Sequence, residues 1–418
     1  MIKKFTVSLC LLFAIGAMAQ QGTASPYSFY GIGDFKFKGT AEAAAMGGIG
    51  IFPDSIHLNL QNPAAYTSLK LTTLAFGGTY STSNLRTNSQ TEKARRTTVD
   101  YIALGIPMGK FGATLGLMPT SYVGYKNQTT VQNLEIRRSF GRGGVNKAFV
   151  GLAYKLTSNL SVGADFGYNF GQIETKDIVF LNDIQYGSRE LNTSNLSGLT
   201  VNTGLMYSSK IKKKYDFYGS FIFTPQSNLN LTNSRKTALI VYSQDVEQET
   251  IVAGSEIENT NNVDKEIKLP SKLAFGAGFG RDRKWLIGAE ITLQQTSSLS
   301  NRFNDITKGR FENAKRYVVG GYYVPKYNSF NSYFERITYR GGFRYENTGL
   351  VINNKSINDM AVSAGFGLPV GGRLSNVNLG IEVGKKGTKA NDLIEDKYVN
   401  FILSFSLSDK WFVKSKYN

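Results

Sequence analysis

The sequence predicts an all-β fold, a transmembrane antiparallel β-barrel of about 14 strands preceded by a segment that does not alternate. Three observations indicate this class. Apolar residues recur at every second position over most of the chain, and short and long connections alternate between these segments. No apolar run after the leader is long enough for a membrane-spanning helix.

Residues 1–19 are typical of a secretory signal peptide. Lys3 and Lys4 precede the apolar stretch 5–17, and Ala17-Met18-Ala19 follows as a small-x-small cleavage site. We expect cleavage after Ala19, so the chain is exported and the mature protein contains no cysteine.

Residues 20–69 do not alternate, and we expect them to form an N-terminal hatch or plug. A small, Ala-rich stretch around 39–46 is followed by a glycine run, then by Asp54, then by Asn62-Pro63-Ala64. Fifty residues before a barrel are either a disordered leader or a plug. Their alanine, isoleucine and leucine content favours packing.

We expect residues 70–412 to form the β-barrel and residues 413–418 a C-terminal tail. Alternation is clearest over 160–170 and 285–293, where apolar side chains lie on one face and small or polar ones on the other. The expected strands lie near 71–84, 96–107, 111–125, 145–157, 159–174, 195–209, 214–226, 270–280, 284–296, 315–324, 335–346, 358–370, 374–384 and 397–408.

The connections distinguish a barrel from a soluble β-sandwich, which would alternate in the same way. Short connections are expected at 107–111, 156–160, 210–214, 280–284 and 370–373. Long polar connections are expected at 85–95, 126–144, 175–194, 227–269, 297–314, 347–357 and 385–396, while 325–334 is long where a short one belongs. Outer-membrane barrels have short periplasmic turns and longer outer loops, so we expect the protein in the outer membrane of a Gram-negative bacterium.

Ionisable residues within the expected strands fall on the polar face, which a closed sheet turns toward the lumen. These lumen charges are Asp165, Glu290, Arg340, Arg344, Glu346 and Glu382. They serve either as structural ion pairs or as groups that guide a substrate, and the sequence leaves both roles open.

The chain lacks the residues of most catalytic and metal sites. His57 is the single histidine, so no histidine-based triad or metal cluster forms, and no Gly-x-Ser-x-Gly elbow occurs. We therefore expect no enzyme activity, no metal and no cofactor. The formal charge of +17 lies in clusters near strand ends, which after a signal peptide indicates contact with outer-membrane lipid phosphates rather than with nucleic acid.

The hatch segment resembles that of the FadL-like family, the long-chain fatty acid transporters of the outer membrane. The resemblance lies in the run 45–50, then Asp54, then the Asn-Pro-Ala turn at 62–64, with a Leu-Pro strand start at 269–270. It implies a fourteen-stranded barrel whose hatch plugs the lumen. It also implies a hatch and gating set made of Gly47, Gly48, Gly50, Asp54, Asn62, Pro63 and Ala64.

The family resemblance further implies a lateral opening where the third strand kinks inward. In this chain the third expected strand contains Pro119 and Gly124. Proline cannot donate to a ladder and glycine marks bulges, so we expect the opening at these two residues. The alternative is that Pro119 lies near the outer rim, where pairing ends in any case.

Two functions follow from this sequence. The first is a channel for hydrophobic, fatty-acid-like small molecules, gated by the hatch, with outer-membrane lipids and a hydrophobic ligand as partners. The second is a structural or accessory subunit of a larger outer-membrane secretion or assembly complex, as in the related PorV-like branch. In that case the expected loop 227–269 is the surface for protein partners.

Overall fold

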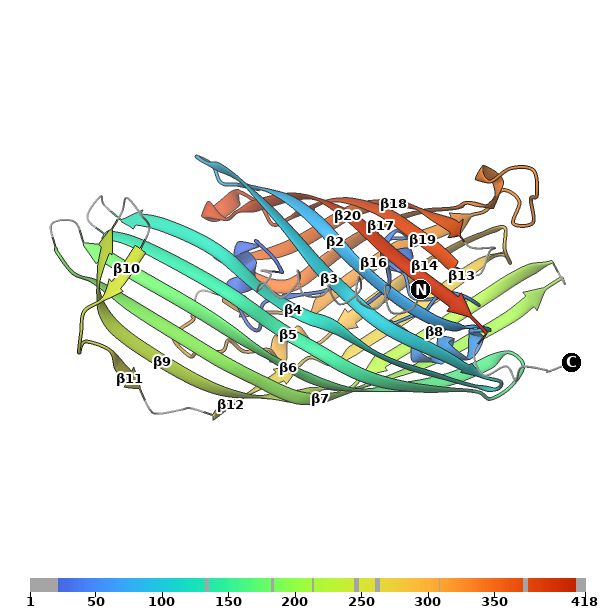
Figure 1. The fold of residues 1–418 in the computed structure, drawn as a ribbon, viewed down its shortest axis with the longest axis horizontal. Coiled ribbons are helices and arrows are strands. Elements are labelled where there is room, and N and C mark those ends of the chain that lie inside the picture. The colour runs from blue at the N-terminus through green and yellow to red at the C-terminus, as the bar shows by residue number, and fades with distance from the viewer. Residues whose placement is uncertain are drawn as a thin grey trace, which may run out of the picture.

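The computed structural model describes residues 22–131, 135–181, 184–212, 214–243, 248–259, 264–307, 309–370 and 375–410. The expected signal peptide and the expected tail lie outside these residues. Over the described ranges the strands form one antiparallel sheet that closes on itself (Figure 1). Closure occurs because β2 (Thr72–Arg86) pairs with both β3 (Thr91–Met108) and β20 (Glu395–Asp409).

The other strands of the wall follow one another around the barrel. They are β4 (Phe111–Val131), β5 (Glu135–Lys155), β6 (Leu160–Leu181), β7 (Gly187–Ile211), β8 (Tyr215–Thr224), β9 (Ser227–Ser243), β10 (Gln248–Ile251), β11 (Ile257–Asn259), β12 (Asp264–Leu269), β13 (Lys272–Arg281), β14 (Trp285–Gln294), β15 (Gly309–Phe311), β16 (Ala314–Tyr323), β17 (Thr338–Ile352), β18 (Lys355–Val370) and β19 (Ser375–Lys386).

Several of these strands are consecutive parts of one crossing of the wall. β8 and β9 both pair with β7, β10 to β12 continue into β13, and β15 and β16 both pair with β17. The described strands therefore form a barrel of fourteen crossings, which confirms the predicted fold class.

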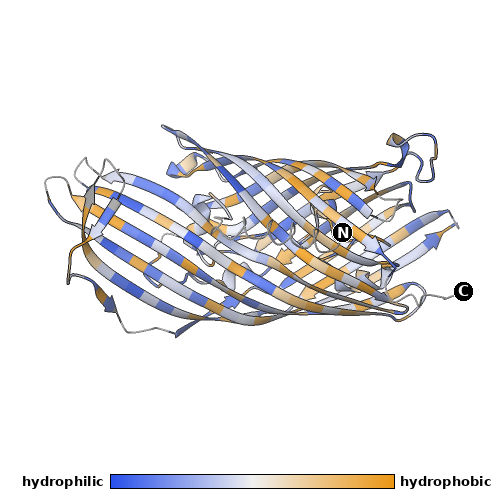
Figure 2. Ribbon diagram, viewed as in Figure 1, coloured by the Kyte–Doolittle hydropathy of each residue, from blue (hydrophilic) through white to orange (hydrophobic). Residues whose placement is uncertain are grey.

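The outer part of the wall is taller than the sequence pattern predicts. The prediction of loops at 126–144, 175–194, 227–269 and 347–357 is wrong, because β4 to β7, β9 to β12, β17 and β18 extend through these ranges. Figure 1 shows these extensions at one end of the barrel, and Figure 2 shows that this end is more hydrophilic. A sheet with water on both faces does not need an apolar face, so the alternation that predicts strands disappears there.

The outward face of the barrel is apolar. Large exposed side chains include Leu115 at 48%, Phe166 at 63% and Ile287 at 56% of full exposure. Such a face suits the hydrocarbon core of a bilayer, where a closed sheet also satisfies every backbone group. The helices of the described residues are all too short or too polar to cross a membrane.

Residues 22–71, which we call the hatch, pack against the inner face of the wall. The hatch contains η1 (Pro26–Phe29), β1 (Asp34–Phe35), α2 (Ala41–Ala44) and η2 (Pro63–Ser68). Short helices outside it are η3 (Thr296–Ser298), η4 (Phe334–Arg336) and η5 (Ala390–Asp392). Hatch apolar residues cluster with inward wall residues, as Ile49 and Ile51 do with Leu286 and Val318. Burial of these apolar side chains provides the driving force that keeps the hatch inside the barrel.

Candidate functional site

The glycine run of the hatch is bonded directly to the wall. The Gly47 amide donates to Ser363 Oγ at 2.8 Å, and the Gly50 amide donates to Glu290 Oε2 at 2.9 Å. Arg316 donates to the carbonyl oxygens of Gly47 and Gly48 at 3.1 and 3.2 Å. Gly48 has a φ of +88°, and a Cβ there would lie 2.0 Å from Arg316, so only glycine fits this approach.

Asp54 closes a short turn around the single histidine. Its carboxylate accepts from the Ile56 amide at 2.9 Å and lies 2.9 Å from His57 Nδ1. Burial disfavours the charged carboxylate, but the neighbouring His57 outweighs burial and holds the pKa of Asp54 below its usual range. For His57, burial opposes protonation, but the charges of Asp54 and Glu42 together raise its pKa above the ordinary value.

The Asn62-Pro63-Ala64 turn joins the hatch to the wall at η2, the last helix of the hatch. Asn62 Oδ1 accepts from the Ala64 amide at 3.0 Å and thereby caps η2. Asn62 Nδ2 donates to the Leu205 carbonyl at 3.0 Å and to Ser220 Oγ at 2.8 Å. Asn62 and Ala64 are fully buried. The wall comes this close because Gly204 has no side chain, since a Cβ there would lie 2.0 Å from Asn62 Oδ1.

Three predicted lumen charges are buried against the hatch or the inner wall. Asp165 accepts from Tyr66 Oη at 2.7 Å and pairs with Lys38 Nζ at 3.3 Å. Glu290 receives the Gly50 amide described above, and Arg340 donates to Asn378 Oδ1 at 3.0 Å. Asp165 and Glu290 therefore bond to the hatch, and Arg340 bonds to another strand of the wall, β19.

The remaining predicted charges form one network around Arg344. Its guanidinium lies 3.3 Å from Glu346, 3.4 Å from Glu382 and 3.0 Å from Asp359. Arg344 also donates to Tyr398 Oη at 2.9 Å. The positive charge of one guanidinium thus interacts with the negative charges of three carboxylates inside the barrel.

An inner cavity of about 240 Å³ lies beside these charges. Basic side chains outnumber acidic ones in its lining, and they include Lys38, Lys147 and Arg316. Lys147 is buried, with its ammonium 5.3 Å from the centre of the Phe149 ring. A larger cavity of about 590 Å³ lies at the end of the barrel that carries the short turns, lined by Asp54 and His57 among others.

The wall changes its pairing around Pro119. β3 and β4 pair from Ile102–Leu117 to Met108–Phe111, and farther along β4 the hatch strand β1 pairs instead, with Asp34 opposite Tyr122. The β4–β5 register shifts between Pro119 and Ser121.

Hatch residues contact both sides of this change in pairing. Lys36 Nζ lies 2.9 Å from Asp100 on β3, and a Cβ on Gly124 of β4 would lie 2.0 Å from the Thr23 carbonyl oxygen. The Tyr122 hydroxyl donates to the Val99 carbonyl at 3.2 Å, so one side chain of β4 reaches the edge of β3.

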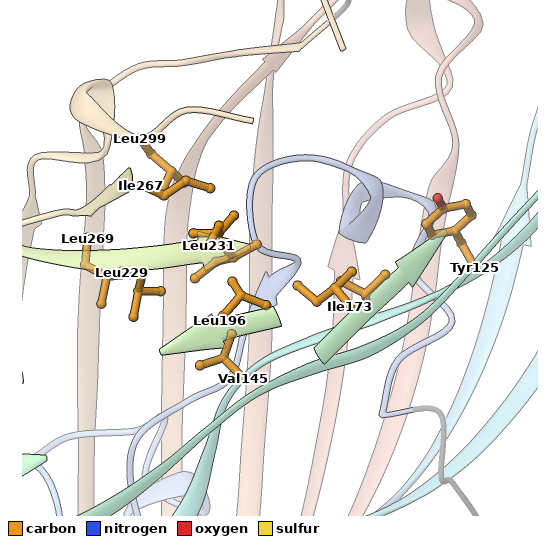
Figure 3. Close-up of a cluster of buried hydrophobic side chains, with 11 residues drawn as sticks. Tyr125, Val145, Ile173, Leu196, Leu229, Leu231, Ile267, Leu269 and Leu299 are labelled. Carbon is orange, nitrogen blue, oxygen red and sulfur yellow. The ribbon is translucent and has the colours of Figure 1, made fainter. Parts of the chain in front are cut away.

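An apolar cluster lies inside the barrel next to this edge. It joins the hatch residue Ile32 to inward side chains of six strands of the wall and to Leu299, which follows η3. Figure 3 shows its members facing one another beside the hatch. The wall members are Val123, Tyr125, Val145, Ile173, Leu196, Leu229, Leu231, Ile267, Leu269 and Leu299.

The comparisons with known proteins identify the family of this chain. A family model described as BamG matches residues 1–418. The chain belongs to the BamG family. No curated protein matches this BamG-family chain.

Solved structures share the fold of the BamG-family chain. The CymD monoaromatic hydrocarbon channel is 15% identical over 90% of this chain and 99% of its own, with a TM-score of 0.59. The toluene transporter TbuX of Ralstonia pickettii is 12% identical over 89% and 99%, with a TM-score of 0.56. A FadL homologue of Pseudomonas aeruginosa is 11% identical over 90% and 98%, also with a TM-score of 0.56. At these identities the likeness establishes the FadL-type fold.

Several residues that hold this BamG-family site are absent from the sequence-based prediction. Glu42 accepts from Asn378 and Ser406, Tyr66 and Lys38 hold Asp165, and Arg316 holds the glycine run. Lys38, Glu42 and Tyr66 lie in the hatch, which has no alternation to assign a face. Arg316 is the exception, because it lies in an expected strand. There its place in the alternation could have assigned it to the inner face. Over the described residues no group of three or more His, Cys, Asp or Glu side chains is placed to hold a metal ion.

Proposed function

We propose that this barrel is an outer-membrane channel that passes hydrophobic small molecules through the wall between β3 and β4. The observation that carries the proposal is the change of pairing beside the apolar cluster. Direct pairing of β3 with β4 stops at Ile102 and Leu117, and β4 then contributes Val123 and Tyr125 to the cluster. An apolar solute in the outer leaflet would pass from lipid to apolar side chains without crossing the polar rim.

The contacts that cover this edge are few enough to open. β1 pairs with β4 over two residues. Among the described residues the gap to β3 is spanned by the Tyr122–Val99 hydrogen bond, the Lys36–Asp100 ion pair and a hydrogen bond from Arg96 to the Thr23 carbonyl. A hydrogen bond contributes a net ~1 kcal/mol, so these contacts hold the edge shut by only a few kcal/mol. Local opening with a free energy of this size is common in native proteins.

The hatch would gate the path below the cluster. The amides and carbonyls of Gly47, Gly48 and Gly50 and the side chain of Asn62 fasten the hatch to the wall. A solute that leaves the cluster can reach the other end of the barrel only when some of these bonds break. We propose Asp54, Pro63 and Ala64 as further parts of this gate because they shape the turns that carry these contacts.

The substrate class is proposed from chemistry and from the solved neighbours. The cluster offers aliphatic and ring surface, and burying apolar surface contributes about 25 cal/mol per Å². CymD is described as a monoaromatic hydrocarbon channel and TbuX as a toluene transporter. We therefore propose aromatic hydrocarbons and fatty-acid-like molecules as solutes, with no chemical reaction on them.

A cross-link across the edge tests the lateral path. Val99→Cys with Tyr122→Cys would be bridged by a flexible bis-maleimide, and the only natural cysteine, Cys10, lies in the expected signal peptide. The control is Ile106→Cys with Ala113→Cys, two residues that already face each other in the β3–β4 ladder.

The readout is uptake of radiolabelled toluene and oleate into liposomes that contain the purified barrel. We expect the Val99–Tyr122 bridge to lower uptake at least tenfold and the control bridge to leave it unchanged. Equal uptake with both bridges in place would refute lateral entry.

A second candidate function is an accessory subunit of a larger outer-membrane complex. It is favoured by exposed aliphatic side chains on the hydrophilic outer extension, namely Leu239 at 48%, Val241 at 41% and Ile257 at 71% exposure. Lipid does not cover that part of the wall, so a protein would be the natural cover.

Co-purification from the native outer membrane tests this second candidate. Leu239→Lys with Ile257→Lys should release a bound protein, whereas Thr232→Lys, also on β9, should retain it. Co-purified proteins that stay bound to the double variant would exclude this surface as the interface.

A further inference from the structure

A separate cavity of about 470 Å³ lies at the outer mouth, away from the β3–β4 edge. The extended parts of β5, β6, β7 and β9 form one side, and the hatch rings of Phe29 and Tyr30 with the connection 303–307 form the other. We call this space the outer vestibule. The gating and lateral-entry arguments use none of the residues that line it, apart from the contact of Phe29 with the apolar cluster.

The charges of the outer vestibule balance one another. Its lining contains the guanidinium groups of three arginines and the carboxylates of three acidic residues, and among the described residues it contains no lysine. They are Arg137, Arg189, Arg235, Asp177, Glu190 and Asp305. All six end in flat groups that can each form two parallel hydrogen bonds. A strongly charged ligand is therefore not favoured, but a neutral ligand rich in hydroxyl groups is.

Some of this hydrogen-bonding capacity is already fixed in place and some is unused. Arg235 lies 3.3 Å from Glu190 and 2.8 Å from Asp305, which orients all three groups. Arg189 is held by Glu256 at 2.8 Å, while its buried Nε has no hydrogen-bond partner among the described residues.

Aromatic rings accompany these polar groups. The Arg235 guanidinium lies 5.0 Å above the Phe303 ring, and Phe29 and Tyr30 meet edge to face with centroids 5.1 Å apart. Gly309 permits this position of Tyr30, because a Cβ there would lie 2.3 Å from the Tyr30 ring. Aliphatic side chains in the lining are limited to Val179 and Ile306 among the described residues.

We propose that the outer vestibule binds a neutral oligosaccharide presented from outside the cell. A sugar has adjacent hydroxyl groups that match guanidinium and carboxylate pairs, and its C–H faces pack against rings such as Phe303. The cavity volume lies within the ordinary range for ligand sites. A peptide is less favoured because the two aliphatic residues form no pocket for apolar side chains.

A glycan array probed with the detergent-purified, fluorescently labelled barrel tests this proposal. We expect retention on one structural class of neutral oligosaccharide. Phe303→Ala and Thr307→Ala should each weaken binding to the selected glycan about tenfold in a titration. The matched control is Phe334→Ala, a ring with 71% exposure outside the vestibule, which should bind like the parent.

The same set of variants is used to check that the barrel is folded and to test a peptide as the alternative ligand. Each variant should keep the heat-modifiable gel migration of a closed barrel, so that a loss of binding reports on the vestibule. Retention of no glycan, or equal glycan binding by Phe303→Ala and the parent, would overturn the proposal. Binding of a peptide library in place of every glycan would also overturn it and would assign the vestibule to a polypeptide.

Discussion

Replacing Asn62 by alanine should loosen the hatch without unfolding the barrel. Asn62 is fully buried, and its side chain accepts one hydrogen bond from Ala64 and donates two, to Leu205 and Ser220. At ~1 kcal/mol for each bond, the substitution costs about 3 kcal/mol, and the buried groups left without partners add to this. Two of these bonds join the hatch to the wall and the third caps η2 within the hatch, so the cost applies to the docked hatch and not to the closed sheet.

The expected consequence is a large increase in local opening. Every 1.4 kcal/mol changes an equilibrium about tenfold, so about 3 kcal/mol raises the open population of this part of the hatch by more than a hundredfold. Amide hydrogen exchange measures this population directly when opening and closing are fast. Residues 59–69 should exchange about a hundredfold faster in Asn62→Ala, while the peptides of β19 and β20 keep their rates.

The matched control is Asn159→Ala, which removes a half-buried asparagine from a short turn at the end of the wall. Its exchange over residues 59–69 should equal that of the parent. If exchange in Asn62→Ala rises less than threefold, the three bonds do not hold the hatch, and the gating set would have to be placed elsewhere.

Three other predictions follow from the site. First, the hatch should be most stable between about pH 4 and pH 6.5, the ordinary pKa values of a free aspartate and histidine. The raised pKa of His57 gives stability that is present below its unfolded value and is lost as pH rises through the folded value. The lowered pKa of Asp54 gives stability that is present above its unfolded value and is lost as pH falls. Hydrogen exchange of residues 50–60 against pH checks this, and His57→Gln should flatten the alkaline side. Second, Arg344→Ala should destabilise the barrel by about 3 kcal/mol in urea unfolding, because it leaves three half-buried carboxylates without their shared cation. The exposed Arg283→Ala should cost less than about 1 kcal/mol, and equal costs would contradict the network. Third, Gly48→Val should displace Arg316 and raise uptake of apolar solutes, whereas Gly109→Val, with open space around its Cβ, should not. Unchanged uptake in Gly48→Val would argue against gating at the glycine run.

The strands of the barrel wall could be predicted from the sequence in the parts that contact lipid or the hatch. In strands such as Leu160–Leu181 the first half alternates between apolar and polar residues. One face of this half meets hydrocarbon, and the other meets polar groups in the lumen. The same physics placed Asp165, Glu290 and Arg344 on the inner face. The pattern ended where water reaches both faces, so the outer parts of β4 to β7 and of β9 to β12 were expected to be loops.

The sequence by itself determined the barrel fold, the number of strands and the fact that the charged side chains face the lumen. It could do so because the lipid or water that each face of a strand meets decides whether the residues on that face are apolar or polar. Only the tertiary structure decided which partner each inner group finds. Asn62 meets Leu205, Gly50 meets Glu290, and β1 covers β4 at Tyr122, over separations of more than 80 residues. No local pattern encodes such contacts, because they depend on how a segment without alternation docks inside a closed sheet.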